Sequence, residues 1–453
     1  MQEFDIIIIG SGSGLNVASE AAEMGLSVAV IDPTPMGGTC LNRGCIPSKF
    51  LIHRADVAET IRRSSEFGIT SKIQKINFPK ITSLAYNEIT RDALNIEKGI
   101  SQTKNMTLFK EWCKFSGERT LKVGNKQIRG KKIIIAAGTR PMIPKINGIH
   151  KVSHYTSDDV MFIKKLPKSM IILGGSFIAT ELAHFFGSMG TKITIVQRSK
   201  LLNREDGEIA DVFTKIISKK YNVLLGYETD SVSQKGKVIS LTIKNKKGST
   251  KKLRADALLV ATGRIPNTDL LDVKKGGIET DERGFVKVDD YLETCAENVW
   301  ALGDIVGKYL LKHSANLESQ YVINNALGNE KKKVDYWPMP HAVFSSPQIA
   351  SVGYTEEELK DMGKKYAVGK YEYEHTGMGL ALNEKDGFVK ILADKNSHQI
   401  LGCHIIGPEA SSIIHEVIVA MRLNATVEQL VRAVHIHPAL SEVVQRAAAN
   451  VEF

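Results

Sequence analysis

Two stretches of this 453-residue chain repeat one pattern, in which an apolar strand runs into a glycine-containing turn, a helix and a second strand. In the first stretch the strands are 6–9 and 27–31. Glycines in such a turn let the backbone approach a pyrophosphate at the start of the helix, and an acid about 20 residues later can bind the ribose hydroxyls. The residues of this first site are Gly10, Gly12, Gly14 and Asp32. Leu15 stands where the third glycine of the usual pattern falls, and we expect Gly14 to compensate in part.

The second copy begins with the strand 170–173 and keeps only one of the three pattern glycines, Gly174, because Ser176 and Ala179 replace the others. The helix and the strand 192–196 that follow still give it the context of a nucleotide site. The chain is therefore predicted to be an α/β protein with two Rossmann-like dinucleotide-binding domains.

The end of the strand 192–196 predicts which nucleotide the second site prefers. An NAD site usually carries a carboxylate here, which would repel a 2′-phosphate, but this chain has Gln197. Arg198 and Arg204 follow it. Because guanidinium groups bind phosphate through paired charge-assisted hydrogen bonds, these residues favour NADP over NAD. The alternative interpretation is a basic surface turn.

Cys40 and Cys45 lie five residues apart near the start of a predicted helix. On a regular helix this spacing places the Cα atoms about 8 to 9 Å apart, beyond the roughly 7 Å that a disulfide spans, so a bond requires a bend, which Gly44 permits. A thiol at a helix N-terminus is also more acidic than usual. The alternatives are two ordinary buried cysteines or half of a zinc site, but zinc ligands usually have closer spacing and a second pair elsewhere. We interpret the pair as a redox-active disulfide and predict no metal site.

The three remaining cysteines are scattered singly along the chain. Cys113, Cys295 and Cys403 are each expected to be a small buried hydrophobic side chain, most clearly Cys403 in the apolar strand 400–406. No role is assigned to them.

Composition bounds the location and the partners of the chain. At this length, 43% hydrophobic and 24% charged residues predict three or four domains. The first strand begins almost at Met1 and no apolar run reaches about 18 residues, so we expect no membrane partner and a cytoplasmic location. A lasting structural disulfide is unusual in that reducing compartment, which favours a catalytic pair. The formal net charge of +10 comes with lysine runs at 244–247 and 331–333 that lack interleaved aromatic residues, so no nucleic-acid partner is expected.

Taken together, these residues resemble the pyridine nucleotide-disulfide oxidoreductases, the family of glutathione reductase and dihydrolipoamide dehydrogenase, from end to end of the chain. The redox motif over 37–49 is the most specific match. Four further segments occur in the order that the family requires: 136–141 with Gly138, 261–267 with Gly263, 301–304 with Asp304, and 435–442 with His437 and Glu442.

The resemblance implies a division into four parts. These are an FAD-binding domain over 1–148, an NAD(P)-binding domain over 149–265, a central segment over 266–335 that completes the FAD domain, and a C-terminal α+β dimerisation domain over 336–453. FAD and a nicotinamide nucleotide are the implied cofactors, and a homodimer is the implied assembly.

The resemblance also assigns roles around the flavin. Cys45 would be the thiol next to the flavin, and Cys40 the interchange thiol that reacts with the substrate. Lys49 matches the lysine near flavin N5, and Glu181 matches its ion-pair partner. Asp304 matches the acid that holds the ribityl chain; on its own it would be interpreted as a turn residue that follows a strand.

The segment 435–442 resembles the part of the family that supplies an acid/base group from the other subunit of the dimer. His437 would exchange protons with the interchange thiol, and Glu442 would orient its ring and raise its basicity. The family pattern of His-Pro followed by Glu favours His437 over His435, although many members have threonine where this chain has Ala439.

The substrate is less constrained than the site. Mercuric reductases and the high-molecular-weight thioredoxin reductases need an additional cysteine pair near the C-terminus, which 450–453 does not supply. The redox motif is the common one of dihydrolipoamide dehydrogenase, which passes electrons from a thiol to NAD. The glycine turns and the arginine pair look closer to mycothione reductase and similar NADPH-dependent enzymes.

We therefore expect electrons to pass from NADPH through FAD and the Cys40–Cys45 disulfide to a small thiol disulfide. Oxidation of dihydrolipoamide with NAD is the second interpretation. A third, of another class, is a flavin-linked redox sensor or NAD(P)H oxidase. The pair of His437 and Glu442 argues against it, because a sensor has no need of a positioned proton donor.

Overall fold

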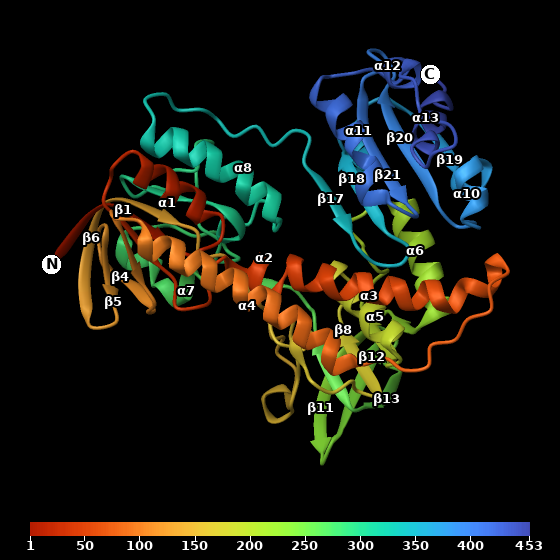
Figure 1. The fold of residues 1–453 in the computed structure, drawn as a ribbon, viewed down its shortest axis with the longest axis horizontal. Helices are drawn as coiled ribbons and strands as arrows, with labels where there is room; N and C mark the ends of the chain where they lie inside the picture. Colours follow the sequence, from red (N-terminus) through yellow and green to blue (C-terminus); the bar gives the residue numbers. More distant parts are fainter.

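The computed structural model describes residues 1–453, which form three lobes (Figure 1). The N-terminal lobe is built on a seven-stranded sheet in the order β3-β2-β1-β6-β5-β4, with a further strand, β16, paired to β6. The strands are β1 (Gln2–Ile9), β2 (Val28–Ile31), β3 (Met106–Phe109), β4 (Cys113–Gly117), β5 (Thr120–Val123), β6 (Lys126–Ile135) and β16 (Val299–Ala301). β3, β2, β1, β6 and β16 run parallel, whereas β4 and β5 are antiparallel additions to the first half of β6.

The predicted βαβ unit is present in this lobe. β1 pairs with β2 along Ile6–Ile9, and the crossover helix α1 (Gly14–Glu23) buries Val17, Ala18 and Ala21 against the sheet. The isoleucine run of β1 is almost wholly buried, as expected for a strand that is covered on both faces. α8 (Lys312–Val322) packs against α1, and α7 (Thr268–Leu271) lies near β4.

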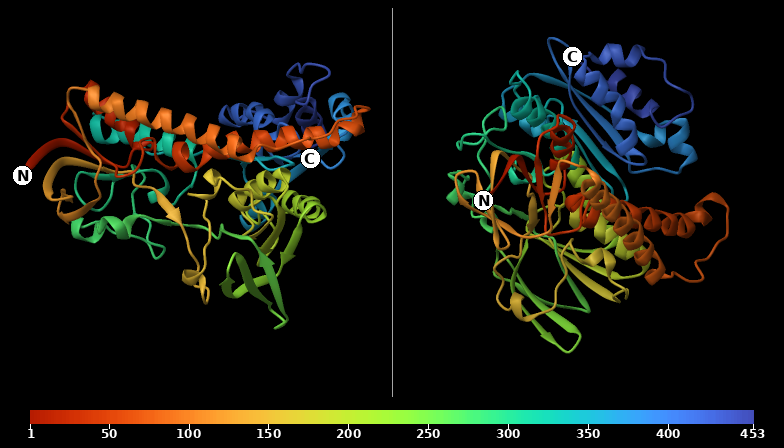
Figure 2. Two further views of the ribbon diagram at one scale, coloured as in Figure 1. Left: turned by 60° about the horizontal axis from the view of Figure 1, so that its bottom comes forward. Right: turned by 60° about the vertical axis from the view of Figure 1, so that its left-hand side comes forward.

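Two long helices reach from this lobe to the second lobe, and the second of them returns the chain to β3. α3 (Cys45–Arg63) and α4 (Phe78–Gln102) run side by side along the molecule (Figure 2). The short α2 (Gly38–Arg43) leads into α3. Leu51 and Ala55 of α3 belong to the same hydrophobic core as Phe185 and Phe186 of the second lobe, so α3 fixes the start of the redox motif against both lobes.

The second lobe repeats the nucleotide-binding architecture on a smaller scale. Its parallel sheet has the order β10-β9-β8-β14, and a three-stranded antiparallel sheet, β11-β12-β13, projects from it. The elements are β8 (Ser169–Leu173), α5 (Phe177–Met189), β9 (Lys192–Gln197), α6 (Gly207–Lys220), β10 (Asn222–Leu225), β11 (Tyr227–Lys235), β12 (Val238–Asn245), β13 (Thr250–Ala255) and β14 (Ala257–Val260). The chain enters and leaves this lobe through a two-stranded ribbon formed by β7 (Thr139–Pro141) and β15 (Arg264–Pro266).

The C-terminal lobe is an antiparallel sheet in the order β17-β18-β21-β20-β19, against which α11 and α13 pack. Its elements are β17 (Pro340–Val343), β18 (Ile349–Gly353), α9 (Glu356–Asp361), β19 (Tyr366–Glu372), α10 (Gly377–Ala381), β20 (Phe388–Asp394), β21 (Ile400–Ile406), α11 (Ala410–Arg422), α12 (Val427–Arg432) and α13 (Glu442–Ala449). The α+β prediction for this region is confirmed, whereas the four-part division at 148, 265 and 335 stays a prediction.

The cysteine predictions hold for two residues and fail for the third. Cys113 and Cys403 are buried in strands, as expected. Cys295 is exposed instead. It lies in the polar turn before β16, where the neighbouring Thr294 takes the buried position, and its Sγ donates a hydrogen bond to the carbonyl of Gly277 at 3.3 Å. None of the helices combines the length and the hydropathy needed to cross a bilayer.

Candidate active site

The two glycine turns are built in the same way. Gly10 has φ +103°, and a Cβ there would lie 2.3 Å from the carbonyl oxygen of Ala136. Gly174 has φ +110°, and a Cβ there would lie 2.2 Å from the carbonyl oxygen of Ala261. Both positions therefore require glycine, because the turn bends back against the end of the neighbouring strand. The weaker second pattern thus folds into the same turn as the first.

The other two glycines of the first turn differ, because Gly14 is tightly packed whereas the space beside Gly12 is open; we call this open turn the nucleotide cradle. A Cβ at Gly14 would lie 2.9 Å from the Cβ of Ala136, so Gly14 provides the close packing of helix on sheet that Leu15 could not. A Cβ at Gly12 would meet no atom within 4 Å. Gly38 approaches this backbone from the other side, since its own Cβ would lie 2.8 Å from Gly12 Cα. The redox motif therefore begins directly on the nucleotide turn.

Asp32 holds the turn in shape. Its Oδ2 accepts hydrogen bonds from the backbone N–H and the hydroxyl of Ser11, at 2.9 and 2.6 Å. Its Oδ1 accepts from the backbone and the hydroxyl of Thr34. Because an ionised carboxylate offers about four acceptor sites, these contacts use its full capacity in the chain by itself. The ribose role of Asp32 stays a prediction, and it requires a ribose hydroxyl to share or replace one of these donors.

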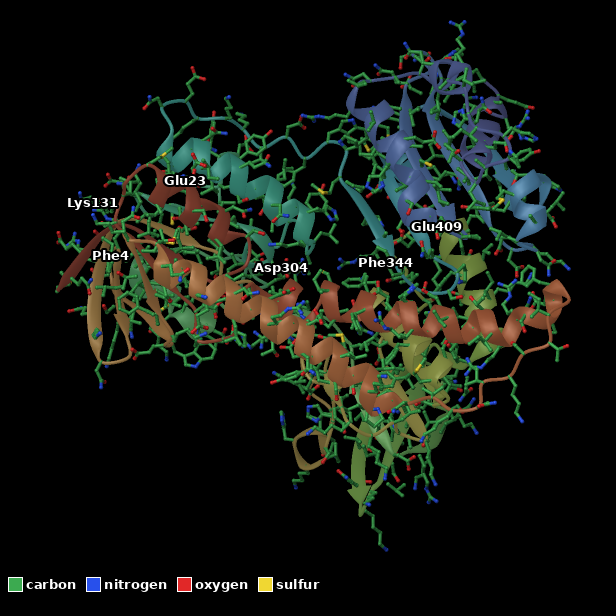
Figure 3. All side chains as sticks on the ribbon, viewed as in Figure 1. Phe4, Glu23, Lys131, Asp304, Phe344 and Glu409 are labelled. Atoms are coloured by element: carbon green, nitrogen blue, oxygen red, sulfur yellow. The ribbon has the colours of Figure 1, made fainter.

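Asp304 lies where three of the sequence motifs meet, in the middle of the molecule (Figure 3). Thr139 donates a hydrogen bond to its carboxylate at 3.1 Å, and Arg264 donates to Thr139 at 2.7 Å. Burial raises the pKa of Asp304. Gly138 and Gly263, both with positive φ, form the turns on which Thr139 and Arg264 are held. A partly buried carboxylate whose one hydrogen-bond donor is Thr139 has acceptor capacity left for a polyhydroxyl ligand.

The helix break at Gly44 brings the two cysteines together. α2 ends at Arg43, Gly44 takes φ −136° and ψ −116°, and α3 restarts at Cys45. A Cβ at Gly44 would lie 2.9 Å from the carbonyl oxygen of Thr39, so a larger residue would push the two helices apart. Cys40 and Cys45 are free thiols, and each is close enough to the other to shift its pKa. The bend that a bond between them requires is therefore present.

The two thiols differ strongly in acidity. The hydrogen bond from Cys40 and the nearby charge of Lys49 outweigh burial and lower the pKa of Cys45 to about 7. The same hydrogen bond, together with burial, raises the pKa of Cys40. Cys45 is also the first residue of α3, where unpaired backbone N–H groups favour an anion. In the reduced pair the negative charge therefore resides on Cys45.

This asymmetry predicts a titration that can be checked directly. In the reduced protein one thiolate should form with a pKa near 7, and the second should not form until well above the ordinary thiol range. The ultraviolet absorbance of thiolates, followed against pH, measures both steps. Cys45→Ser should remove the step near pH 7, whereas Cys40→Ala should move it to higher pH because alanine has no group to donate the hydrogen bond. An unchanged step in Cys40→Ala would contradict the assignment.

Lys49 lies one helical turn after Cys45 and joins α3 to the second lobe. Its Nζ lies 2.9 Å from Glu181 Oε2, and Glu181 is buried in α5. The same carboxylate accepts a hydrogen bond from the backbone of Phe344, whose ring lies under the Lys49 ammonium at 4.3 Å. All three lobes therefore meet at this ion pair, and Figure 3 shows Phe344 beside the centre of the molecule.

The second turn presents a basic edge that has Gln197 where an NAD site usually carries a carboxylate. Ser176 is the N-cap of α5, and Gln197 packs over Gly175, where a Cβ would lie 2.8 Å from Gln197 Cγ. Arg198 and Arg204 are exposed beyond it. Arg198 has only a distant acidic neighbour, Glu228, at 4.0 Å.

His437 and Glu442 are brought together as the family resemblance implies. His437 Nδ1 lies 2.9 Å from Glu442 Oε1, and the hydrogen bond holds the pKa of Glu442 below its usual value. The His437 side chain is 76% exposed, so its Nε2 is free to meet a group outside this chain. His435 is different, because its side chain is 6% exposed and its Nε2 lies 2.9 Å from Glu416. Within this chain His437 has no contact with the cysteines.

Three residues that contact the predicted site residues were not predicted from the sequence. Thr139 and Arg264 occur in the segments 136–141 and 261–267, but nothing in a single sequence signals that Arg264 bonds to Thr139 and that Thr139 bonds to Asp304. Lys312, at the start of α8, donates a hydrogen bond to Ser13 of the first glycine turn at 2.9 Å. The only feature of the sequence that could have indicated this contact is the position of Lys312, eight residues after Asp304.

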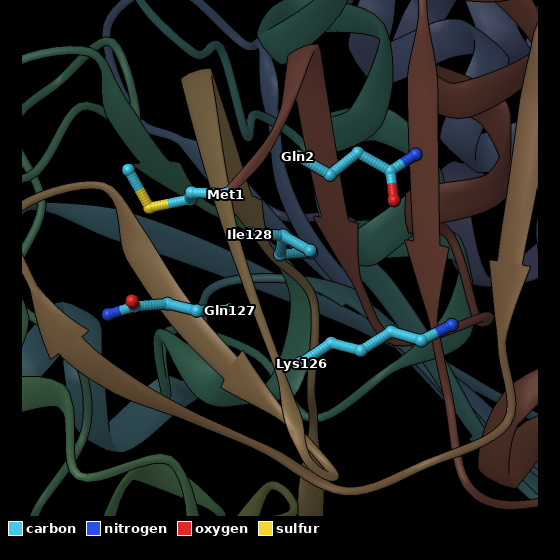
Figure 4. A pocket seen from close by; sticks show the side chains of 5 residues that line it. All are labelled: Met1, Gln2, Lys126, Gln127 and Ile128. Atoms are coloured by element: carbon cyan, nitrogen blue, oxygen red, sulfur yellow. The ribbon is translucent and has the colours of Figure 1, made fainter.

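One surface pocket lies away from these residues. Met1, Gln2, Lys126, Gln127 and Ile128 line it (Figure 4). It lies where β1 and β6 begin, at the opposite end of the sheet from the Gly10 turn. No predicted site residue lines it.

Comparison with known proteins agrees with this geometry. Residues 4–322 match the family described as "Pyridine nucleotide-disulphide oxidoreductase", and residues 339–448 match its dimerisation domain. The chain is 36% identical over 460 residues to mycothione reductase of Mycobacterium tuberculosis, covering 99% of both chains. It is 31% identical over 456 residues to dihydrolipoyl dehydrogenase of Vibrio cholerae, covering 99% of this chain and 95% of that one.

A solved structure shows the same fold. The HOCl-induced flavoprotein disulfide reductase RclA from Escherichia coli superposes with a TM-score of 0.88 at 28% identity, covering 99% of this chain and 100% of that chain. A Cu(II) complex of the same reductase superposes with a TM-score of 0.89, also at 28% identity, covering 99% of both chains. Both family segments, relatives above 30% identity over nearly the whole chain and this fold agree, and the chain belongs to the pyridine nucleotide-disulphide oxidoreductases, enzymes that transfer electrons between thiols or disulfides and a nicotinamide.

Proposed function

We propose that this enzyme passes electrons from NADPH through FAD and the Cys40–Cys45 pair to a low-molecular-weight disulfide. The observation that carries the proposal is the helix break at Gly44, which sets an acidic thiol beside a less acidic one at the edge of a nucleotide cradle. Such a pair is suited to thiol–disulfide exchange, because one sulfur is stabilised as the anion and the other carries the proton.

FAD is the cofactor expected for this family, and the residues present fit it. The open position at Gly12 and the turn at the start of α1 suit a pyrophosphate, and Asp304 suits a chain of hydroxyls. When bound, FAD supplies the ability to take two electrons from a nicotinamide and give them to a disulfide. The protein itself positions the thiols and holds Lys49 against Glu181 between the two nucleotide sites.

The preference for NADPH rests on the end of β9. Gln197 leaves no carboxylate to repel a 2′-phosphate, and Arg198 and Arg204 are exposed next to it. Dihydrolipoyl dehydrogenase is among the relatives, so NAD is the alternative, and the measurement below separates the two.

Removing either arginine should weaken NADPH selectively. A charge-assisted hydrogen bond contributes about 1.5–3 kcal/mol, so Arg204→Ala or Arg198→Ala should raise the KM for NADPH by about 10- to 100-fold while leaving kcat and the KM for NADH nearly unchanged. Gln197→Glu should act in the same direction. Arg254→Ala, an exposed arginine on β13 of the same lobe, is the matched control. Wild-type turnover that is as fast with NADH as with NADPH would contradict the assignment.

The substrate is tested by a steady-state panel. NADPH oxidation is measured with mycothiol disulfide, glutathione disulfide, other small disulfides and Cu(II), which is included because a structural relative is described as a Cu(II) complex. Reduction of NAD by dihydrolipoamide is measured in parallel. Fast turnover of one small disulfide supports the proposal, which the 36% identity to a mycothione reductase favours. Turnover confined to dihydrolipoamide with NAD would assign the enzyme to the alternative.

A homodimer is part of the proposal. The C-terminal lobe leaves large apolar side chains exposed on neighbouring segments: Val419, Leu423, Val434 and Ile436. Such a surface suits a second copy of the chain. Ile436 adjoins His437, so a partner on this surface would bring the free Nε2 of His437 to a neighbouring subunit. We place the enzyme in the cytoplasm, where thiol pairs of this kind are kept cycling.

A redox sensor or NAD(P)H oxidase is the remaining alternative. A sensor would respond to oxidants through the thiol pair alone, with no use for the bond between His437 and Glu442. The response of the His437→Gln variant, described in the Discussion, distinguishes the two.

A further inference from the structure

Lys312 is a cation that the fold holds inside the predicted flavin cradle. It is the first residue of α8, and its Nζ donates a hydrogen bond to Ser13 Oγ at 2.9 Å. Ser13 in turn donates to Asn316 Oδ1, one helical turn further along α8, at 2.9 Å. Ser13 is buried and directly follows Gly12, against which Gly38 of the redox motif packs. These contacts place the Lys312 ammonium between the nucleotide turn and the segment that carries Cys40.

The charge of Lys312 is not balanced within the chain. No carboxylate lies within 4 Å of its Nζ, and its only hydrogen-bond acceptor is a neutral hydroxyl. Lys49, four residues after Cys45, is neutralised by Glu181 at 2.9 Å. Burial lowers the pKa of Lys312, while the ionisable groups that oppose this effect are Cys40, Cys45 and Asp304. A half-buried ammonium without an anion is costly unless a ligand or a reaction supplies the negative charge.

We propose that Lys312 is the counter-ion for the negative charge that reduction brings to the junction of the flavin cradle and the thiol pair. A hydride delivers two electrons and one proton, so each reduction adds one negative charge to the site. If the charge lies on the sulfurs, the disulfide has become one thiol and one thiolate; if it lies on the cofactor, it lies in the cradle that Ser13 lines. Lys312 faces both places and stabilises the reduced state over the oxidised state.

This inference requires the family's flavin and thiol pair, but neither NADPH nor a particular substrate. The test is therefore a redox titration of the purified holoenzyme against reference dyes with dithionite as the reductant, so a wrong nicotinamide or substrate assignment leaves its result intact. Lys312→Met should lower the equilibrium constant for two-electron reduction at least tenfold, which is about 30 mV. Lys312→Arg should keep it within threefold, because the charge is retained.

Two controls separate a charge effect from a structural one. Lys308→Met removes the same charge from an exposed site four residues earlier and should leave the equilibrium constant within threefold of wild type. Ser13→Ala removes the hydrogen bond but not the charge, and its effect should be smaller than that of Lys312→Met. Thermal unfolding of all four variants shows whether any of them alters the fold.

A second measurement identifies where the charge resides. Thiolate absorbance of the reduced, flavin-free protein is followed against pH in wild type and in Lys312→Met. A thiolate step moved to higher pH identifies the sulfurs as the partner, and a changed flavin potential with an unmoved thiolate step identifies the cofactor. If Lys312→Met matches Lys308→Met in both the potential and the thiolate titration, the proposal is overturned. For a variant that fails to retain flavin the thiolate step alone decides, because the charge of Lys312 opposes the raised pKa of Cys40 in the chain by itself: a step moved to higher pH supports the proposal, and an unmoved step overturns it.

Discussion

Replacement of His437 by glutamine is expected to slow disulfide turnover by about 10²- to 10⁴-fold, the usual contribution of a positioned acid/base group, while reduction of the flavin by NADPH stays at the wild-type rate. When the interchange thiol attacks a disulfide, the departing sulfur needs a proton, and the imidazole supplies it. The Glu442 carboxylate holds Nδ1 at 2.9 Å and leaves Nε2 for this transfer. Glutamine keeps the hydrogen bond but cannot exchange the proton at neutral pH. Stopped-flow measurement of the reductive half-reaction, beside steady-state turnover, separates the two steps.

His435→Gln is the matched control, because His435 lies two residues away and is occupied by Glu416. Its turnover should stay within a fewfold of wild type if the protein folds. Glu442→Gln should give an intermediate loss, since it weakens the orientation and basicity of His437 without removing the ring. If His437→Gln turned over at the wild-type rate, or if His435→Gln lost turnover instead, the acid/base assignment would be wrong. A protein that turns over no disulfide even as wild type, and that keeps its oxidant response in His437→Gln, would instead be the sensor.

Residues that are close in sequence were the ones that a single sequence could place. The strand-turn-helix units around Gly10 and Gly174 depend on local chemistry, because a turn that bends back on a neighbouring carbonyl accepts only glycine. The bend at Gly44 follows from the same argument. The interaction of His437 with Glu442 was predictable from the family resemblance of the segment 435–442. These features can be predicted from one sequence because each depends on only a few residues that are close along the chain.

Contacts between distant segments were not predictable in this way. Lys312 and Ser13 are about 300 residues apart, and neither belongs to a pattern that names the other. Cys295 was predicted to be buried because cysteine usually is. It is exposed instead, because the buried position in this polar turn is taken by its neighbour Thr294. Residue type gives a preference for burial, whereas the fold decides which side of a turn faces inward.

A buried ion pair between lobes is the clearest case of such a long-range contact. Lys390 on β20 is 3% exposed, and its Nζ lies 3.0 Å from Asp206 Oδ1 and 2.6 Å from Glu356 Oε2. Asp206 is wholly buried and caps α6 by accepting a hydrogen bond from Glu208 N. It follows Arg204 by two residues, so the cluster ties the end of the proposed phosphate-binding turn to the C-terminal lobe. In Figure 1, α6 lies between these two lobes.

Lys390→Met should therefore destabilise the protein by about 3–5 kcal/mol at neutral pH, because it leaves the Asp206 carboxylate buried without its cation. Lys360→Met is the matched control. Lys360 also pairs with Glu356, at 2.9 Å, but its side chain is 60% exposed, so its loss should cost only about 0–1 kcal/mol. Denaturant unfolding of both variants beside wild type measures the difference. Equal midpoints for Lys390→Met and Lys360→Met would show that the buried pair contributes no more than the exposed one.

The pH dependence of the unfolding free energy tests the same ion pair. Burial opposes ionisation of Glu356, but its bonds to Lys360 and Lys390 outweigh this and lower its pKa to about 2; the pKa of Asp206 is also lowered, against burial, by the charges around it. Carboxylates whose pKa is depressed in the folded state stabilise it above their unfolded values of about 4, and this stabilisation is lost as the pH falls. In Lys390→Met the uncompensated carboxylates instead gain by protonation. The difference in unfolding free energy between wild type and Lys390→Met should thus be largest near pH 7 and should shrink as the pH falls below about 4. A difference that stayed constant over this range would mean that lost packing of the lysine stem, and not its charge, accounts for the destabilisation.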